Sequence, residues 1–359
     1  MRKHIVVIAG DGIGQEVTAI GKQVLEAIAL KFNHEFTFDT ALIGHVAIEA
    51  TGNPLPEETI IKAKVSDAIL FGAVGHPKYD NDPSARVRPE QGLLGIRKAL
   101  GLYANIRPIK LFDELLSASS IKPEILKGAD ILFFRELTGD VYFGERGRSE
   151  DRNTAYDTMI YSRYEVERIA IKAFDAAMTR RKKLCSVDKA NVLESSRLWR
   201  EVVQEIATRY PEVTVEHQFV DAAAMLLIKD PCRFDVVLTG NLFGDILTDE
   251  ASQIAGSMGM LASASIGDIV GLYEPIHGSA HDITGTDVAN PLASVLSVAL
   301  MLDISFGMKA ESEAVVKAVD TVLKAGFRTN DIAEKRIPPE KKLGTQGMGQ
   351  HVLRALFDR

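Results

Sequence analysis

The chain has 359 residues, with 42 Lys and Arg against 49 Asp and Glu and a formal net charge of −7. This acidic balance argues against a nucleic-acid or anionic-membrane binder, whose surface would be basic. Hydrophobic residues make up 46% of the chain, which excludes intrinsic disorder. The length exceeds the roughly 250–300 residues that one core usually serves, so we expect two domains.

The two cysteines, Cys185 and Cys232, are too few for a disulfide framework or a four-cysteine metal site, so we expect reduced thiols. The apolar run that follows His4 is too short for the core of a signal peptide. The longest apolar stretch, residues 291–302, is too short to span a bilayer. We therefore expect a cytoplasmic protein.

Short β-rich runs alternate with amphipathic helices along most of the chain. We expect strands over 3–9, 35–40, 67–73, 102–109, 130–137, 182–188, 212–219 and 235–240. A helix follows the first strand, and further helices are expected near 163–181, 193–208, 221–229, 242–257, 290–307, 311–326 and 346–357. The alternation predicts an α/β fold with parallel strands. Because no Pro/Gly-rich linker divides the chain, we expect it to cross between its domains twice.

The first strand ends in Gly10-Asp11-Gly12-Ile13-Gly14, which opens a helix. A dinucleotide-binding fingerprint requires G-x-G-x-x-G, and here the third glycine comes one residue early. An Asp inside the loop would also repel a pyrophosphate. We therefore expect that this is not a standard Rossmann site.

Three aspartates are candidates for a metal site. Asp245 and Asp249 are four residues apart, so they share one face of a helix and repel each other unless a cation or another partner offsets the repulsion. Asp221 lies between a strand end and an apolar helix, where it is either an N-cap or a ligand. A solvated helix face is the alternative interpretation of the Asp245 and Asp249 pair.

Several basic residues lie within or at the end of apolar segments. Arg107 and Arg135 each end a strand, and Arg97 lies in Leu93-Leu94-Gly95-Ile96-Arg97. Guanidiniums from separate elements suit a substrate with more than one carboxylate, although single arginines are usually solvated. Lys189 directly follows a buried strand, where a lysine can have a depressed pKa and act as a base. Taken alone, an exposed surface lysine would be the better interpretation. Other site residues close to it would favour the catalytic one.

Together the motifs GDGIG, LLGIRK, ANIRP, RELTGDVYFGE, VDKANVLE, VDAAAM, GNLFGDILTDE and EPIHGSAHDITG resemble those of the β-decarboxylating dehydrogenases, in the same order and at similar spacing. That family includes isocitrate, isopropylmalate, homoisocitrate and tartrate dehydrogenases. The resemblance covers essentially the whole chain. It implies an isocitrate/isopropylmalate dehydrogenase-like two-domain fold, with 1–102 plus 256–359 as a large cofactor-binding domain and 103–255 as a smaller dimerisation and substrate domain.

The resemblance also implies roles for individual residues. Arg97, Arg107 and Arg135 would bind the malate carboxylates, and Asp221, Asp245 and Asp249 would hold Mg²⁺ or Mn²⁺. Lys189 would accept the proton of the C2 hydroxyl while hydride passes to the nicotinamide, and Tyr142 would protonate the enolate carbon after CO₂ departs. Lys189 and Asp221 would reach into the site of the partner subunit, so each active site would require a homodimer.

Substrate and cofactor preferences can be argued from local residues. Leu93 would offer an apolar wall and Glu90 would repel a third carboxylate, so an isopropyl substituent fits and an isocitrate-type substrate does not. The loop of His277, Gly278, Ser279, Ala280, His281 and Asp282 resembles the one that wraps the adenosine, and Asn290 would contact the adenine side. Asp282 would accept hydrogen bonds from ribose hydroxyls and repel a 2′-phosphate, which favours NAD.

The resemblance therefore predicts oxidative decarboxylation of (2R,3S)-3-isopropylmalate in leucine biosynthesis. A same-fold dehydrogenase acting on D-malate, tartrate or homoisocitrate is the alternative. A non-catalytic regulatory subunit is a second alternative, which the presence of all five of Tyr142, Lys189, Asp221, Asp245 and Asp249 argues against. Two residues depart from the family pattern, since His281 and Gln15 each stand where Pro is commoner.

Overall fold

The structure is a computed structural model that describes residues 1–80, 82, 85–334 and 337–358. The chain divides into two compact units, the first made of Met1–Leu102, Phe112–Ser119 and Ala255–Arg359 and the second of Tyr103–Leu111 and Ser120–Ile254. The chain therefore passes between the units more than twice. None of the described helices is long and apolar enough to cross a membrane.

The strands of the first unit lie in the order β2-β1-β3-β12-β11. They are β1 (Arg2–Gly10), β2 (Glu35–Thr40), β3 (Ala68–Ala73), β11 (Ala262–Ile266) and β12 (Gly271–Pro275). Strands β1, β2, β3 and β12 pair in parallel, and β11 runs antiparallel to β12. Every residue of β3 and β12 is buried, as is typical of central strands covered on both faces.

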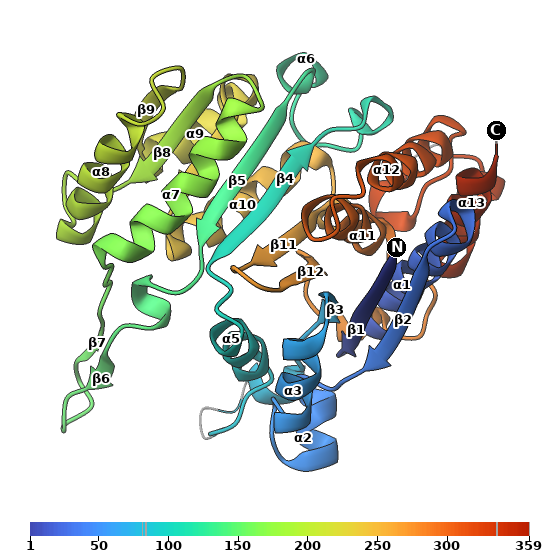
Figure 1. The fold of residues 1–359 in the computed structure, drawn as a ribbon, viewed down its shortest axis with the longest axis horizontal. Coiled ribbons are helices and arrows are strands. Elements are labelled where there is room, and N and C mark those ends of the chain that lie inside the picture. Colours follow the sequence, from blue (N-terminus) through green and yellow to red (C-terminus); the bar gives the residue numbers. More distant parts are fainter. Residues whose placement is uncertain (81, 83–84, 335–336, 359) are drawn as a thin grey trace. The chain divides into compact units, whose positions relative to one another are not determined.

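Helices cover both faces of these strands. The helices of this unit are α1 (Gly14–Phe32), α2 (His45–Thr51), α3 (Glu57–Val65), α4 (Pro77–Asp80), α5 (Glu90–Ala99), α11 (Leu292–Ile304), α12 (Lys309–Lys324) and α13 (Thr345–Phe357). Helix α1 packs against β1 and β3 and also against α11 and α13, which brings the two ends of the chain into one unit (Figure 1). Five short 3₁₀ turns complete the described part of the unit, at Asp113–Leu115, Met258–Met260, His281–Ile283, Asn330–Ile332 and Pro339–Lys341.

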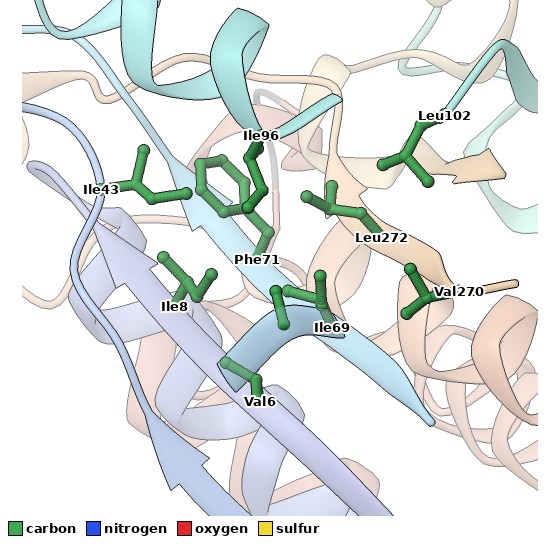
Figure 2. Packing of buried hydrophobic residues seen from close by; sticks show 10 residues of the cluster. Val6, Ile8, Ile43, Ile69, Phe71, Ile96, Leu102, Val270 and Leu272 are labelled. Carbon is green, nitrogen blue, oxygen red and sulfur yellow. The ribbon is translucent and has the colours of Figure 1, made fainter. Parts of the chain in front are cut away.

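The opposite face of the first unit carries a hydrophobic cluster that seats α5. Figure 2 shows Phe71, Ile8 and Ile69 from the strands converging with Ile43 and with Ile96 of α5. Burying one such side chain contributes about 1.5–3 kcal/mol. Because Ile96 is anchored in this cluster, the position of the adjacent Arg97 in α5 is determined by core packing.

The strands of the second unit lie in the order β4-β5-β10-β8-β9. They are β4 (Ala104–Lys110), β5 (Asp130–Glu136), β8 (Lys183–Asp188), β9 (Thr214–Phe219) and β10 (Val236–Thr239). Strand β4 pairs antiparallel with β5, and the others pair in parallel. A separate two-stranded ribbon consists of β6 (Arg146–Arg148) and β7 (Ala155–Asp157).

The helices of this unit are α6 (Pro123–Leu126), α7 (Arg163–Met178), α8 (Glu194–Ala207), α9 (Val220–Lys229) and α10 (Asn241–Ala255). Helix α7 packs on β5, β8 and β10 and against α8, while Figure 1 shows α10 behind β4 and β5. The 3₁₀ turn Asp140–Tyr142 follows β5, and the 3₁₀ turn Pro231–Arg233 precedes β10. Cys185 and Cys232 are both free thiols, as expected.

Candidate active site

Two of the three arginines predicted to bind substrate share one face of the β4–β5 pair. Asn105 lies directly opposite Arg135 in the antiparallel register, and Arg107 lies opposite Phe133. Because side chains two residues apart point to the same face of a strand, Arg107 and Arg135 lie on the same side of the sheet. Both are buried, with 7% and 3% of their surface exposed.

Helix α10 presents a polar face to these two guanidiniums. Asn241, Asp245, Thr248 and Asp249 recur at the spacing of one helix face. Arg135 donates from Nε and Nη2 to Oδ1 of Asn241, at 3.1 and 2.8 Å, and from Nη1 to Oδ1 of Asp245. Arg107 donates from Nη1 to Oγ1 of Thr248 at 2.5 Å, and this nitrogen lies 3.6 Å from Oδ1 of Asp249.

Tyr142 joins the same cluster. Its hydroxyl donates to Oδ2 of Asp245 at 2.7 Å, so both oxygens of that carboxylate are engaged. Burial, together with the adjacent Asp245, raises the pKa of Tyr142 to about 12. The phenol therefore keeps its proton at neutral pH and is available as a proton donor.

The two carboxylates of α10 differ in charge environment. Burial raises the pKa of Asp249, and the neighbouring Arg107 only partly opposes this effect. Burial also acts to raise the pKa of Asp245, but Arg135, the Tyr142 hydroxyl and Arg107 outweigh it, so the pKa of Asp245 is lowered. The repulsion expected between two carboxylates one turn apart is therefore offset in this structure by two guanidiniums.

The start of α10 is capped by two residues that sequence reasoning missed. The Asn241 backbone N–H donates to the hydroxyl of Tyr161 at 2.7 Å, and that of Leu242 donates to Oδ2 of Asp140 at 3.1 Å. Tyr161 in turn donates to the Asp140 carboxylate at 3.2 Å. Asp140 is 1% exposed and has a φ of 72°, a conformation that costs free energy for residues other than Gly. No local signal reveals these caps, because they lie roughly 80–100 residues from α10 in sequence.

Lys189 and Asp221 form a separate pair in the second unit. Residues Asp188 and Phe219 are aligned at the ends of the parallel strands β8 and β9, so the residues that follow them lie close together. The Lys189 ammonium donates to Oδ1 of Asp221, which lowers the pKa of Asp221. The buried carboxylate of Asp188 accepts two hydrogen bonds from Arg200 and one from the Ala190 backbone N–H, which fixes the turn that carries Lys189.

The structure therefore brings Asp245 and Asp249 together with the arginines, whereas Asp221 is paired with Lys189. Within the described part of a single chain, no group of three or more His, Cys, Asp or Glu is arranged to hold a metal ion. Carboxylate oxygens are nevertheless the donors that Mg²⁺ and Mn²⁺ prefer, and Asp245 and Asp249 lie on one helix face, so the donor set fits such an ion.

The remaining predicted substrate residues lie on α5 in the first unit. Arg97 is 9% exposed and donates from Nη2 to Oε1 of Glu274 at 2.7 Å, while its buried Nε has no partner among the described residues. Glu90 is exposed, and Leu93 packs in part against the hydrophobic cluster that holds Ile96. Leu93 therefore contributes to the core as well as to the surface of this helix.

Two of the predicted cofactor residues lie in the wall of a pocket of about 260 Å³ in the first unit. They are His277 and Asn290, and Ile13, which follows the Gly-Asp-Gly turn, and Asp331 also line the pocket. The Ile13 backbone N–H donates to the carbonyl oxygen of Ser279 at 2.8 Å, which joins the turn to the loop. Asn290 donates to Asp331 at 3.0 Å and accepts from the Leu292 backbone N–H.

Two observations test whether this pocket fits a nucleotide. Nε2 of His277 is buried without a partner among the described residues, and burial lowers the pKa of His277, so its ring is neutral at physiological pH. Apart from Gly278 itself and its two neighbours in sequence, no described residue lies within 4 Å of the position that a Cβ on Gly278 would occupy, so the loop backbone is open there. Asp282 is exposed and Ala280 has a φ of 38°. A pocket of this size with an unsatisfied ring nitrogen fits the adenosine part of NAD.

The Gly-Asp-Gly turn has a structural role. The carboxylate of Asp11, 1% exposed, accepts backbone N–H groups of His45, Val46 and Gly75 at 2.8, 3.0 and 3.0 Å. A carboxylate occupied in this way leaves no room for a pyrophosphate at the turn. This agrees with the failed dinucleotide fingerprint.

Comparison with known proteins gives a consistent family. The family model described as isocitrate/isopropylmalate dehydrogenase matches residues 4–352. A 3-isopropylmalate dehydrogenase of Shouchella clausii is 54% identical over 99% of this chain and 98% of the relative. One of Nitratidesulfovibrio vulgaris is also 54% identical, over 97% of this chain and 98% of that relative.

Solved structures give the same result for the fold. An isocitrate dehydrogenase from Methylococcus capsulatus superposes with a TM-score of 0.87 at 32% identity, covering 99% of this chain and all of the other. A β-decarboxylating dehydrogenase from Thermococcus kodakarensis superposes with a TM-score of 0.79 at 32% identity, covering 99% and 96%. The predicted fold class and family are both confirmed.

Proposed function

Because the chain belongs to the isocitrate/isopropylmalate dehydrogenase family, we propose that it catalyses the oxidative decarboxylation of 3-isopropylmalate. The products are 4-methyl-2-oxopentanoate and CO₂, NAD⁺ is reduced, and the reaction is a step of leucine biosynthesis. The names of the relatives that match nearly the whole chain support this substrate. The observation that carries the proposal is the cluster of Arg107, Arg135, Tyr142, Asp245 and Asp249 on one face of the second unit.

The arginines bind the substrate carboxylates. Guanidiniums recognise carboxylates through paired hydrogen bonds, and the buried positions of Arg107 and Arg135 limit competition from water. Arg97, whose Nε is free of partners among the described residues, is the third carboxylate-binding group. Glu90 and Leu93 favour an alkyl substituent over a further carboxylate.

Proton transfers fall to Lys189 and Tyr142. In its neutral amine form Lys189 accepts the proton of the substrate hydroxyl as the hydride leaves, and Asp221 orients its side chain. Tyr142 donates to the enolate carbon after decarboxylation, and the guanidinium of Arg135, 5.6 Å from the centre of its ring, stabilises the charge left on the phenol. The raised pKa of Tyr142 supports its role as the acid.

A divalent cation fits Asp245 and Asp249, with Asp221 supplied by a second copy of the chain. When bound, Mg²⁺ or Mn²⁺ polarises the substrate hydroxyl and lowers its pKa. NAD is held by His277, Gly278, Ser279, Ala280, His281, Asp282 and Asn290 in the first unit. The first unit is thus the cofactor-binding domain, and the second is the substrate and dimerisation domain.

A homodimer follows from the same arrangement. Helix α9 exposes Met225 (60%) and Ile228 (38%), and α10 exposes Ile246 (57%), so both helices offer apolar side chains to a second copy of the chain. We place the dimer contact on these two helices. Sedimentation that found a fully active monomer would contradict this part of the proposal.

A substrate panel tests the proposed reaction. The kcat/KM of the purified enzyme is measured for 3-isopropylmalate, D-malate, tartrate, homoisocitrate and isocitrate, each with NAD and NADP and with Mg²⁺ or Mn²⁺. We expect 3-isopropylmalate with NAD to be preferred by at least about tenfold, and EDTA to abolish the activity until metal is restored. A higher kcat/KM for D-malate, or full activity in EDTA, would show the assignment to be wrong.

A further inference from the structure

Three histidines from separate segments of the first unit pack in one row, with ring planes tilted by 44° between His45 and His76 and by 58° between His76 and His281. His45 begins α2, His76 follows β3, and His281 lies in the loop proposed to hold NAD. The ring centres of His45 and His76 are 4.0 Å apart, and those of His76 and His281 are 4.3 Å apart. We refer to these three residues as the histidine stack. None of the catalytic steps proposed above uses it.

The backbone that carries the stack is firmly anchored. The buried Asp11 carboxylate accepts the N–H groups of His45 and Gly75, so α2 and the segment after β3 share one anchor. Nε2 of His281 lies 2.7 Å from the carbonyl oxygen of Gly75. Since a carbonyl can only accept, Nε2 of His281 carries the proton in this contact. The contact joins the cofactor loop to the segment that bears His76.

The hydrogen bond that the His76 ring accepts requires its neutral form. The backbone N–H of Lys78 donates to Nδ1 of His76 at 3.1 Å, and a ring nitrogen that accepts a hydrogen bond carries no proton. Protonation of His76 at Nδ1 would break this bond and place a cation between two further imidazoles. Both effects disfavour the packed arrangement of the stack.

We infer that His76 and His281 are positioning residues for the cofactor loop, and that the neutral histidine stack makes NAD affinity fall as the solution becomes acidic. The inference rests on the proposed role of the loop 277–282 in binding NAD. The ligand class is a dinucleotide, and the residues involved are distinct from those that touch the reacting atoms.

The charged groups around the histidine stack also favour a neutral His76. Burial lowers the pKa of His76, and His45, His281 and Lys78 lower it further, while Asp11 acts in the opposite sense. The other titratable neighbours are Glu49, 3.9 Å from Nε2 of His45, Tyr79, 3.2 Å from Nδ1 of His45, Glu90 beside Gly75, and Asp282 next to His281.

The sign follows from linkage. The packed stack has a lowered pKa at His76, so it binds a proton less readily than an open loop does. The stabilisation of the packed loop is therefore complete above the ordinary histidine pKa of about 6.5, and it is lost as pH falls through the lowered pKa. Because NAD binds the packed loop, its affinity should fall over the same pH range.

Calorimetric titration of the full-length protein with NAD, from about pH 8 to about pH 5.5, tests the inference. We expect the Kd of the unmodified protein to rise by about fivefold or more over this range. In His76→Asn, whose amide oxygen can accept the Lys78 N–H without acquiring a charge, we expect less than about a twofold change and an unaltered Kd at pH 8. The control is His351→Gln, because His351 packs on Phe327 outside the stack, and this variant should keep the original pH dependence.

A second measurement does not depend on NAD. Exchange of the imidazole C2 hydrogen, followed by mass spectrometry of the unliganded protein, reports the pKa of each histidine. We expect His76 to titrate below about 6.5 and to move back towards that value in His281→Asn.

The outcomes separate the inference from the proposed function. Tight NAD binding that is independent of pH, or that strengthens in acid through attraction of the pyrophosphate, would overturn the inference alone. Absence of NAD binding at every pH would overturn the proposed cofactor together with the inference. An ordinary pKa for His76 would show that the histidine stack is not the cause of any pH dependence of NAD binding.

Discussion

In the second unit, the charged side chains proposed to meet the substrate are already paired with one another, whereas the pocket of the first unit retains a buried nitrogen without a partner. Arg135 is held by Asn241 and Asp245, and Arg107 by Asn105, Thr248 and Asp249. Nε2 of His277 has no such partner in the part of the chain described. A buried charge without a counterion costs much more free energy than a buried neutral ring nitrogen without a partner. In the ligand-free protein the charged groups of the second unit are therefore paired with one another, whereas the ring nitrogen of the first unit can stay unpaired.

This difference predicts how the two regions respond to mutation. In the paired cluster, removal of one group leaves a buried charge uncompensated, so stability and turnover should both change. Around the pocket, exposed groups such as Asp282 can change with effects confined to ligand binding.

The largest effect is expected for Lys189→Ala. Loss of the proposed general base should lower kcat by about 10³-fold, while the Kd for NAD stays within about twofold. Steady-state kinetics and calorimetry measure the two quantities, with Lys324→Ala, which removes an exposed ion pair in the other unit, as the control. A kcat close to that of the unmodified enzyme would rule out Lys189 as the base.

Tyr142→Phe should have the next largest effect. The variant removes the proposed proton donor and one hydrogen bond to Asp245, so we expect kcat to fall by about 10²-fold with a change in substrate KM of less than about threefold. Tyr156→Phe, at an exposed position of β7, is the matched control. Equal losses in both variants would show that Tyr142 is not the acid.

Asp282→Lys tests the pocket. The exchange of an anion for a cation should raise kcat/KM for NADP relative to NAD by about tenfold or more, with little change in thermal stability. Glu313→Lys makes the same change of charge at an exposed position of α12 and should leave the ratio unaltered. A ratio that does not move would mean that Asp282 lies away from the ribose.

Asp140→Ala should have the smallest effect on catalysis and tests how the cluster is held in place. Loss of the α10 cap should lower the free energy of unfolding by about 1–3 kcal/mol, measured by denaturant titration, with a few-fold decrease in kcat. Asp140→Gly removes the same cap but tolerates the φ of 72°. If the Gly variant were as stable as the original, the left-handed backbone rather than the cap would explain the loss in Ala.

The sequence predicted much of the parallel sheet but not all of its strands. Buried runs such as Ala68–Ala73 are rich in large apolar residues and are easily recognised. The strands Ala262–Ile266 and Gly271–Pro275 were missed because Ala, Ser and Gly fill many of their positions, and because burial on both faces removes any alternation of polar and apolar residues. The short helices α2, α3 and α5 were also missed.

For the candidate site, helical spacing correctly placed Asp245 and Asp249 on one face, because that relation is local. The contacts of Asp140 and Tyr161 with α10 were not predictable, since a cap supplied from a distant segment leaves no periodic pattern. The histidine stack is a similar case: residues 45, 76 and 281 become neighbours only through the packing of three segments that are far apart in sequence.

The division of the first unit between the two ends of the chain also has a consequence for biosynthesis. Ile69 of β3 pairs with Leu272 of β12, so the central sheet of this unit cannot close until the ribosome has passed residue 272. At about 5–20 residues per second, the nascent N-terminal third waits for roughly 10–40 seconds with the β3 edge unpaired. The second unit can complete its own strands during that interval, so it should be the first part of the newborn protein to resist protease.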